Sequence, residues 1–360
     1  MLKCTNIELT VKRNKKQEGN KRMKGNVIVG QSGGPTAAIN ASLAGVYRTA
    51  KDRGANKVYG MLHGIQGLLK EKYIDLSDHI KTELDAELLK RTPAAFLGSC
   101  RYKLPEIHEN REVYDKIFEI LDKLDIEVFI YIGGNDSMDT IKKLSDYAII
   151  FGHAIRFIGC PKTIDNDLAL TDHTPGFGSA AKYIASATKE LIRDGLVYDV
   201  KNVTIIEIMG RNAGYIALWC GIANGAEDIL LPEKYDYNEQ ALINNIINSR
   251  KRGKKHHIII NAEGIGHSTS MARRIEAATG IETRATILGY MQRGGSPTCR
   301  DRVYATMMGA MAVDLLCEGK SNRVVGFSHG EFKDFDINEA LGMNKGVSDY
   351  MIKVAKDMSK

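Results

Sequence analysis

The chain has 360 residues, of which 43% are hydrophobic and 26% are charged, and its formal net charge is +6. A chain of this length usually forms two domains or one large α/β unit, and the composition is that of an ordinary globular protein with a real core. The charge is mild and its one dense basic cluster, near the N-terminus, lacks interleaved aromatic residues, which argues against nucleic-acid binding. No apolar run reaches the ~18 residues of a membrane span, so no membrane partner is expected.

The six cysteines stand at positions 4, 100, 160, 220, 299 and 317. They form no C-x-x-C pair and no Cys/His group with zinc spacing, so we interpret them as reduced thiols in a reducing compartment. Because the N-terminus also lacks the apolar core of a secretory signal, we expect a cytoplasmic protein. Residues 1–24 form a basic arm that is expected to be loosely attached; a phosphate-binding or targeting arm is the alternative.

The first predicted elements are a buried strand at 26–30 and a helix at 36–53. Between them Gly33 and Gly34 form a turn, and Pro35 is expected in the first turn of the helix. Strand, glycine turn and helix start together can bind an anion through free backbone N–H groups. A tight turn without a ligand is the alternative. The turn is neither G-x-G-x-x-G nor G-x-x-x-x-G-K-[ST], which counts against a dinucleotide oxidoreductase and a P-loop NTPase.

Strands and helices continue to alternate along the chain. Further strands are predicted at 57–62, 127–132, 155–159, 203–208, 228–231, 256–261 and 283–288, and helices at 111–124, 180–193, 238–252 and 301–318. The C-terminal ~40 residues are expected to be mixed helix and turn. This spacing predicts an α/β fold with a doubly wound sheet, and the Pro/Gly-rich stretch 174–179 is a candidate domain crossing.

The stretch Pro161–Asp167 is the centre of the functional prediction, because it follows a predicted strand, where α/β sheets bind ligands. Asp165 and Asp167 lie two apart, so in an extended segment both would point to the same side. One carboxylate could then take a proton while the other holds a metal, a sugar hydroxyl or the first carboxylate. An Asx-rich turn is the alternative.

Charged side chains collect at the other predicted strand ends and in a glycine-bearing loop. The full set is Arg101, Asp136, Asp165, Asp167, Arg211, Glu263, Arg284 and Arg293. A carboxylate pair ringed by arginines fits phosphoryl transfer to or from an anionic substrate, because arginine grips phosphate through paired, always-charged donors.

The combination of motifs resembles the phosphofructokinase family, in order, over residues 26–345. The motifs are Gly33-Gly34, Leu97–Arg101, Gly133–Ser137, Pro161–Asp167, Met209–Arg211, Ala262–Gly264 and Thr283–Pro297. Within the family the chain resembles the diphosphate-dependent branch. Lys162 stands where ATP-dependent members carry Gly, and Asp136 stands where they carry a second small Gly.

The resemblance implies two similar three-layer α/β domains with mainly parallel sheets. Residues 25–177 plus 292–345 would bind the diphosphate donor, and residues 178–291 plus 346–360 would bind the sugar phosphate. It also implies a homodimer or homotetramer with shared active sites.

The implied reaction is a glycolytic step, the reversible transfer of a phosphoryl group from diphosphate to the 1-hydroxyl of fructose 6-phosphate. Asp165 would be the general base, Thr163 and Asp167 would orient the hydroxyl, and Lys162 and Arg211 would complete the catalytic set. The donor site would comprise Gly33, Gly34, Arg101, Gly134, Asp136, Ser137 and Lys162. The sugar-phosphate site would add Met209, Gly210, Arg211, Glu263, Arg284, Tyr290 and Arg293, with Arg284 reaching across a subunit boundary.

The resemblance also implies Mg²⁺, held through Asn135 and Asp136, although Asn135 stands where the family commonly has an aspartate ligand. Two alternatives remain open. The donor could be ATP, or the chain could be a non-catalytic paralogue that senses a sugar phosphate through the same site.

Overall fold

The computed structural model describes residues 23 and 25–359, apart from 170, 198 and 235–236. The basic arm predicted at 1–24 therefore lies outside the described residues except for Met23. Met23 is buried, and its backbone N–H donates to the carbonyl of Arg53 at 2.9 Å. None of the helices in the described part of the chain is long and apolar enough to cross a membrane.

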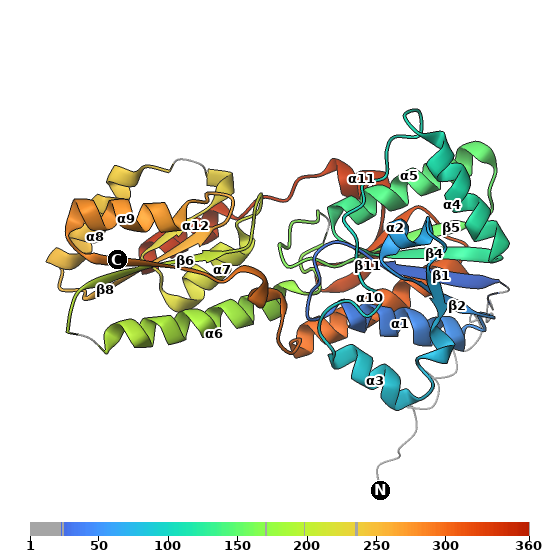
Figure 1. Ribbon diagram of the computed structural model, residues 1–360, viewed down its shortest axis with the longest axis horizontal. Coiled ribbons are helices and arrows are strands. Elements are labelled where there is room, and N and C mark those ends of the chain that lie inside the picture. The colour runs from blue at the N-terminus through green and yellow to red at the C-terminus, as the bar shows by residue number, and fades with distance from the viewer. Residues whose placement is uncertain (1–22, 24, 170, 198, 235–236, 360) are drawn as a thin grey trace, which may run out of the picture.

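Two mainly parallel sheets lie side by side along the molecule (Figure 1). The larger sheet has the order β11-β10-β5-β4-β1-β2-β3, and only its edge strands β3 and β11 run antiparallel to their neighbours. Its strands are β1 (Asn26–Gln31), β2 (Val58–Met61), β3 (Tyr73–Asp75), β4 (Ile126–Gly133), β5 (Arg156–Pro161), β10 (Arg323–Ser328) and β11 (Glu331–Asp336). The smaller sheet, entirely parallel, has the order β7-β8-β6-β9. Its strands are β6 (Asn202–Ile208), β7 (Asp228–Leu230), β8 (His256–Ala262) and β9 (Glu282–Ile287).

Helices cover both faces of each sheet, which confirms the predicted three-layer α/β fold (Figure 1). The larger sheet carries α1 (Ile39–Asp52), α3 (Glu83–Arg91) and α10 (Cys299–Cys317) on one face, and α2 (Gly64–Leu68), α4 (Arg111–Lys123), α5 (Asn135–Phe151) and α11 (Ile337–Gly342) on the other. The smaller sheet carries α6 (Phe177–Leu196), α7 (Tyr215–Asn224) and α12 (Asp349–Met358) on one face, and α8 (Glu239–Lys251) and α9 (Ser268–Thr279) on the other. Three short 3₁₀ helices are η1 (Leu76–Asp78), η2 (Pro232–Lys234) and η3 (Gly289–Arg293).

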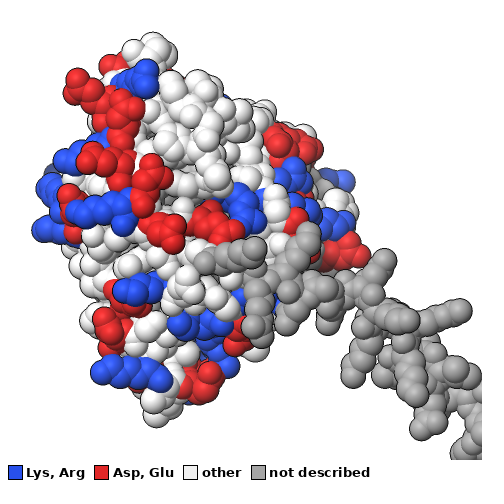
Figure 2. Space-filling view, turned by 90° about the vertical axis from the view of Figure 1, so that its right-hand side faces the viewer, with Lys and Arg blue, Asp and Glu red and all other residues white. Residues whose placement is uncertain are grey.

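Charges of both signs share the outer end of the larger-sheet half. Figure 2 shows acidic and basic side chains interspersed over this face, with neutral surface between them. This mixture agrees with the small net charge of +6 on 360 residues.

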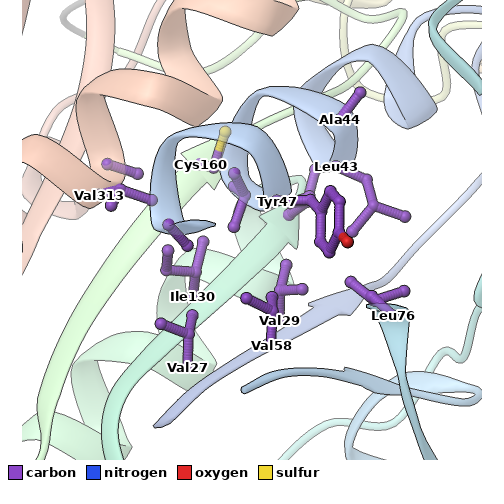
Figure 3. Packing of buried hydrophobic residues seen from close by; sticks show 14 of the residues in the cluster. Val27, Val29, Leu43, Ala44, Tyr47, Val58, Leu76, Ile130, Cys160 and Val313 are labelled. Atoms are coloured by element: carbon purple, nitrogen blue, oxygen red, sulfur yellow. The ribbon is translucent and has the colours of Figure 1, made fainter. Parts of the chain in front are cut away.

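The core of the larger half lies between its sheet and helices α1 and α10. Figure 3 shows Leu43 and Tyr47 of α1 packed against Val29, Val58 and other strand side chains. The central strands are buried on both sides, which explains why they are almost continuously apolar in sequence.

Helices α1 and α10 touch backbone to backbone. A Cβ atom on Gly45 would lie 2.3 Å from the carbonyl oxygen of Thr306, and one on Gly309 would lie 2.2 Å from that of Ser42. Glycine is therefore required at this contact, which fixes the position of α10.

The predicted strands and helices are all present, with ends shifted by a few residues. One shift corrects the reading of Pro35: α1 begins at Ile39, with Ala38 as its N-cap, so Pro35 lies before the helix and not in its first turn. Several elements before the C-terminal region were not predicted, namely α2, β3, η1, α3, η2, α9 and η3.

The C-terminal region was predicted as mixed helix and turn, but it contains the hairpin β10–β11, which extends the larger sheet. The hairpin turn is formed by His329 and Gly330, both with positive φ (53° and 84°). Asn-Gly or Asp-Gly is the usual signal for such a turn, so His-Gly gave little indication of it.

The chain passes between the two sheets three times, through residues 162–176, 288–298 and 343–348. We call these segments the first, second and third crossings. The predicted domains place the larger sheet in one unit and the smaller sheet in the other; the exact boundaries remain a prediction. The five cysteines among the described residues are free thiols.

Candidate active site

Three turns meet at the carboxyl edge of the larger sheet, because strands β1, β4 and β5 are neighbours there. The backbone N–H of Ser32, after β1, donates to the carbonyl of Ile132 at 2.9 Å. The backbone N–H of Lys162, after β5, donates to the carbonyl of Gly133 at 2.8 Å. The structure thus brings together three segments that are separate in sequence, namely the glycine turn at Gly33-Gly34, the turn at Gly133–Ser137 and the stretch Pro161–Asp167.

Lys162 is buried under the glycine turn, with 2% of its surface exposed. Its Nζ donates to the carbonyls of Ser32 and Gly34, both at 2.7 Å. Burial and, to a smaller extent, the charge of the nearby guanidinium of Arg293 lower the pKa of this amine to about 7. The hydroxyl of Ser99 donates to the carbonyl of Gly33 at 2.5 Å, so side chains hold three consecutive carbonyls of the turn. Gly33 has a φ of 77°, which favours glycine there.

Arg293 lies against this same turn. A Cβ atom on Gly34 would be 2.7 Å from the Cζ of Arg293, so glycine is needed for the guanidinium to approach. Burial lowers the pKa of Arg293, and the charge of Arg101 lowers the pKa as well. The sequence prediction assigned Arg293 to the sugar phosphate; its position shows that it also borders the predicted donor turn.

Asp165 is largely enclosed next to these cations. Burial, together with the charges of Asp167 and Glu263, raises the pKa of its carboxyl to about 6, although the charges of Arg293 and Lys162 act in the opposite direction. A carboxylate with such a pKa is ionised at neutral pH and still basic enough to accept a proton from a hydroxyl.

The loop that carries the carboxylate pair is not extended, which corrects the premise that both side chains point to one side. Asn166, between them, has a φ of 54° in the left-handed region. Its side chain is buried and closes the loop: Oδ1 accepts from the backbone N–H of Thr174 at 2.9 Å, and Nδ2 donates to the carbonyl of Asp172 at 3.1 Å. Asparagine suits this position because it tolerates left-handed backbone and can form both bonds.

Asp167 faces the start of α5. Nδ2 of Asn135 donates to Oδ2 of Asp167 at 2.8 Å, and burial raises the pKa of this carboxyl. Asp136 has an exposed side chain that pairs with Nζ of Lys103 at 3.2 Å. Ser137 is buried in the same helical turn, which begins at its N-cap Gly134.

The predicted sugar-binding residues follow strands β6 and β8 of the smaller sheet. The backbone N–H of Met209 donates to Oε1 of Gln292 at 3.0 Å, and that of Glu263 donates to the carbonyl of Ile208 at 2.8 Å. Gly210 has a φ of 127°, and a Cβ there would lie 2.3 Å from the carbonyl of Ala213. The side chains of Arg211 and Glu263 remain exposed.

Two predicted residues lie on exposed surface. Arg284 is on the edge strand β9 and pairs with Glu282 at 2.5 Å. Tyr290 is 77% exposed, and the guanidinium of Arg293 lies 5.4 Å from the centre of its ring. Thr163 lies inside the loop, where its hydroxyl accepts from the backbone N–H of Asp165 at 3.2 Å.

Sequence reasoning missed Lys345, in the third crossing. Its Nζ donates to the carbonyl of Thr171 at 2.6 Å, and burial lowers its pKa to about 8 against the opposing charges of Asp172 and Asp167. Lys345 is a single lysine in a polar segment, so no motif or periodicity pointed to it.

A cavity of about 630 Å³ lies elsewhere, between β7 and α12. Its lining combines apolar side chains such as Leu231 and Ile352 with lysines such as Lys353. It includes none of the predicted site residues.

Comparison with known proteins gives a family and close relatives. The phosphofructokinase family model matches residues 26–316. A protein named ATP-dependent 6-phosphofructokinase from Clostridium acetobutylicum is 39% identical over 335 residues, which cover 93% of this chain and 99% of the relative. The crystal structure of a pyrophosphate-dependent phosphofructokinase from Marinobacter aquaeolei superposes with a TM-score of 0.83 and 32% identity, covering 91% of this chain and 86% of that one. The crystal structure of a pyrophosphate-dependent phosphofructokinase from Nitrosospira multiformis superposes with a TM-score of 0.81 and 31% identity, covering 90% of this chain and 86% of that one.

Proposed function

The chain belongs to the phosphofructokinase family, and from this premise we propose that it transfers a phosphoryl group from diphosphate to fructose 6-phosphate. The products are fructose 1,6-bisphosphate and phosphate. The family supports the sugar phosphate and the reaction. The choice of diphosphate as donor rests on one observation, the buried side-chain amine of Lys162 beneath the glycine turn.

Lys162 favours a compact anionic donor for a physical reason. Burying a cation is unfavourable unless an anion or several acceptors compensate, and here two carbonyls do so only in part, since the pKa falls to about 7. A diphosphate oxygen at the turn would supply the missing negative charge. Arg101 and Arg293 lie close enough to depress this pKa and would add two further cations for the same donor.

Asp136 would act against the larger donor. Its exposed carboxylate lies in the first turn of α5 beside the same turns, where ATP would need room for its α-phosphate and nucleoside. One side chain then attracts diphosphate while another repels ATP, and specificity is commonly built from such a pair.

In the proposed reaction Asp165 takes the proton of the sugar 1-hydroxyl as the oxygen attacks the terminal phosphorus. The P–O–P bond breaks and phosphate leaves, its charge facing Lys162, Arg101 and Arg293. Thr163 and Asp167 orient the attacking hydroxyl. Most of the catalysis is positioning and neutralisation of charge, as in other phosphoryl transfers.

Met209, Gly210, Arg211 and Glu263 would contact the sugar. Arg284 stands on an edge strand next to exposed Ile287, Tyr290 and Met291. We propose that this edge meets a second copy of the chain, so that Arg284 completes the partner's 6-phosphate site.

Magnesium is compatible with the residues present. Nδ2 of Asn135 is used by Asp167, which leaves Oδ1 for a cation, and the Asp136 carboxylate is exposed beside it. In the described part of the chain no three His, Cys, Asp or Glu side chains group to hold a metal alone. Mg²⁺ commonly needs only one or two protein oxygens plus substrate phosphates. When bound, it would neutralise charge on the donor phosphates.

ATP remains the second candidate donor, because the relative from Clostridium acetobutylicum, at 39% identity, carries that donor in its name. A coupled assay with each donor tests the choice on the parent, Lys162→Gly, Asp136→Gly and the double variant. We expect the parent to use diphosphate far better than ATP. The double variant should lose diphosphate activity and gain measurable ATP activity, whereas Lys162→Gly alone should impair both.

Two controls make the assay decisive. Lys162→Met nearly keeps the buried volume and removes the amine together with its two hydrogen bonds to the turn, so it separates the loss of the amine from the cavity that glycine leaves. Lys142→Met removes another lysine, paired with Asp146 along α5, and should leave donor choice unchanged. Parent activity with ATP alone would refute the diphosphate proposal, and inactivity with both donors would favour the non-catalytic alternative.

A further inference from the structure

Asp301, which the proposed mechanism does not use, is fully buried in the first turn of α10. Its Oδ2 accepts from the backbone N–H and the hydroxyl of Ser179, at 2.6 and 2.5 Å. Its Oδ1 lies 2.6 Å from Nε2 of His173, which donates because a carboxylate can only accept. A buried carboxylate persists only with donors of this quality, and all three come from outside its own helix.

The first of these contacts joins the starts of two helices. Ser179 is in the first turn of α6, whose N-cap Gly176 supplies no side-chain cap. First-turn N–H groups have no partner within a helix and favour a negative charge, so Asp301 caps α6 from α10. In return, the hydroxyl of Ser179 accepts from the backbone N–H of Thr298, the N-cap of α10, at 3.0 Å. Helix α6 follows the first crossing and α10 follows the second.

The second contact reaches the loop of the carboxylate pair. His173 precedes Thr174, whose backbone N–H donates to the side chain of Asn166 at 2.9 Å and whose hydroxyl donates to the carbonyl of Thr163 at 3.0 Å. Asn166 stands between Asp165 and Asp167. A continuous chain of hydrogen bonds and short backbone links therefore runs from Asp301 to the proposed base.

We infer that Asp301 is a positioning residue, which uses His173 and Ser179 to hold the loop of Asp165 and Asp167 in register with the second crossing, where Arg293 lies. The inference rests on the proposed roles of Asp165 and Arg293. The base must lie within hydrogen-bond reach of the sugar hydroxyl while Arg293 binds phosphate. A misplacement of about 1 Å in such an arrangement can cost about 100-fold in rate.

The test is Asp301→Asn, which keeps the shape and removes the charge. Asp314→Asn is the matched control: it makes the same change near the other end of α10, where the side chain is 40% exposed and pairs with Arg53. At equal folded fraction, measured by circular dichroism, we expect Asp301→Asn to lower kcat about 10- to 100-fold with the KM for fructose 6-phosphate changed by less than about threefold. The control should match the parent. An unchanged kcat in folded Asp301→Asn would overturn the inference.

A second pair of variants covers the case in which Asp301→Asn does not fold. His173→Gln keeps an N–H donor, whereas His173→Leu fills the space without one. We expect the glutamine variant to retain kcat within about threefold of the parent and the leucine variant to lose about tenfold or more. Equal losses would mean that the ring matters only through its packing on Phe177 and Tyr304, which would also overturn the inference.

Hydrogen exchange separates this inference from the proposed reaction, because it needs no turnover. Backbone amides of residues 163–176 should exchange faster in Asp301→Asn or His173→Leu than in the parent and in Asp314→Asn. Unchanged exchange would refute the coupling even in an active enzyme. An inactive parent whose variants exchange faster would instead refute the proposed function and leave the coupling intact.

Discussion

The buried Lys162 leads to a prediction about proton uptake. Its pKa falls from an ordinary 10.5 to about 7, because burial and the neighbouring arginines disfavour the ammonium relative to water. At pH 8 only about one tenth of the free enzyme should carry the proton. A bound diphosphate would place negative charge next to the amine and restore the ammonium. Binding at pH 8 should therefore take up close to one proton per site.

Isothermal titration calorimetry measures this directly. Diphosphate is titrated into the enzyme at pH 8 in two buffers with different ionisation enthalpies, and the difference in observed heat gives the number of protons exchanged. Lys162→Met is the reference, because it nearly keeps the volume of the side chain, cannot titrate, and reports any proton that diphosphate itself exchanges. Lys142→Met, on exposed α5 surface, should behave as the parent does. Equal proton numbers for the parent and Lys162→Met would refute the reasoning.

Three further predictions follow from the site and the core. Asp165→Asn should lower kcat about 10²–10⁴-fold while fructose 6-phosphate still binds. In the parent, kcat should fall as the pH drops through about 6, because the raised pKa of Asp165 means that the base is protonated below that pH. Full turnover in the variant or a flat pH profile of kcat in the parent would exclude this base. Arg284→Ala and Arg293→Ala should each raise the KM for fructose 6-phosphate about 10- to 100-fold, as expected for the loss of roughly 1.5–3 kcal/mol per charged contact. If the site is shared between subunits, mixing subunits of Arg284→Ala and Asp165→Asn should restore some activity. An unchanged KM for fructose 6-phosphate in both variants would place the phosphate elsewhere. Gly45→Ala should lower the free energy of unfolding by about 1–3 kcal/mol in urea titrations despite alanine's better helix propensity, because the new Cβ would meet a facing backbone carbonyl at 2.3 Å. The control Gly342→Ala, with open space around it, should not destabilise the protein. Equal stability of Gly45→Ala and the parent would mean that α1 and α10 can separate without cost.

The sequence indicated much of the fold because its central strands are apolar and its helices follow glycine turns. Periodicity could not indicate the short, half-buried strand β3, whose pairing depends on a partner already in place. The Pro161–Asp167 stretch was found because unusual residues are concentrated there. Its internal geometry was predicted wrongly, because the extended backbone assumed for Asp165 and Asp167 is broken by Asn166. That conformation depends on a bond from Thr174, eight residues later.

The parts of the site that the sequence did not indicate come from the chain crossings. Lys345, His173 and Asp301 are ordinary residues in sequence, separated by long intervals. Asp301 meets His173, and Lys345 meets Thr171, only because the chain passes between two sheets three times, and only the structure shows which groups face one another there. The position of Arg293 against Gly34 has the same origin, since the second crossing brings a residue from beyond the smaller sheet to a turn of the larger one.

Lys162 and Asp165 depend on each other's charge. The carboxylate of Asp165 raises the pKa of Lys162, and the ammonium of Lys162 lowers the pKa of Asp165. A bound diphosphate alone would raise the pKa of Asp165 and protonate the base at the moment it is needed. If Lys162 takes up a proton with the donor, the added positive charge offsets part of this effect and keeps Asp165 ionised. Interacting groups of this kind titrate as a pair, so the proton counted by calorimetry and the acidic limb of the kcat profile report one coupled equilibrium. A diphosphate enzyme has a reason to bury a lysine three residues before its base: the same ammonium binds the donor and preserves the base that attacks with it.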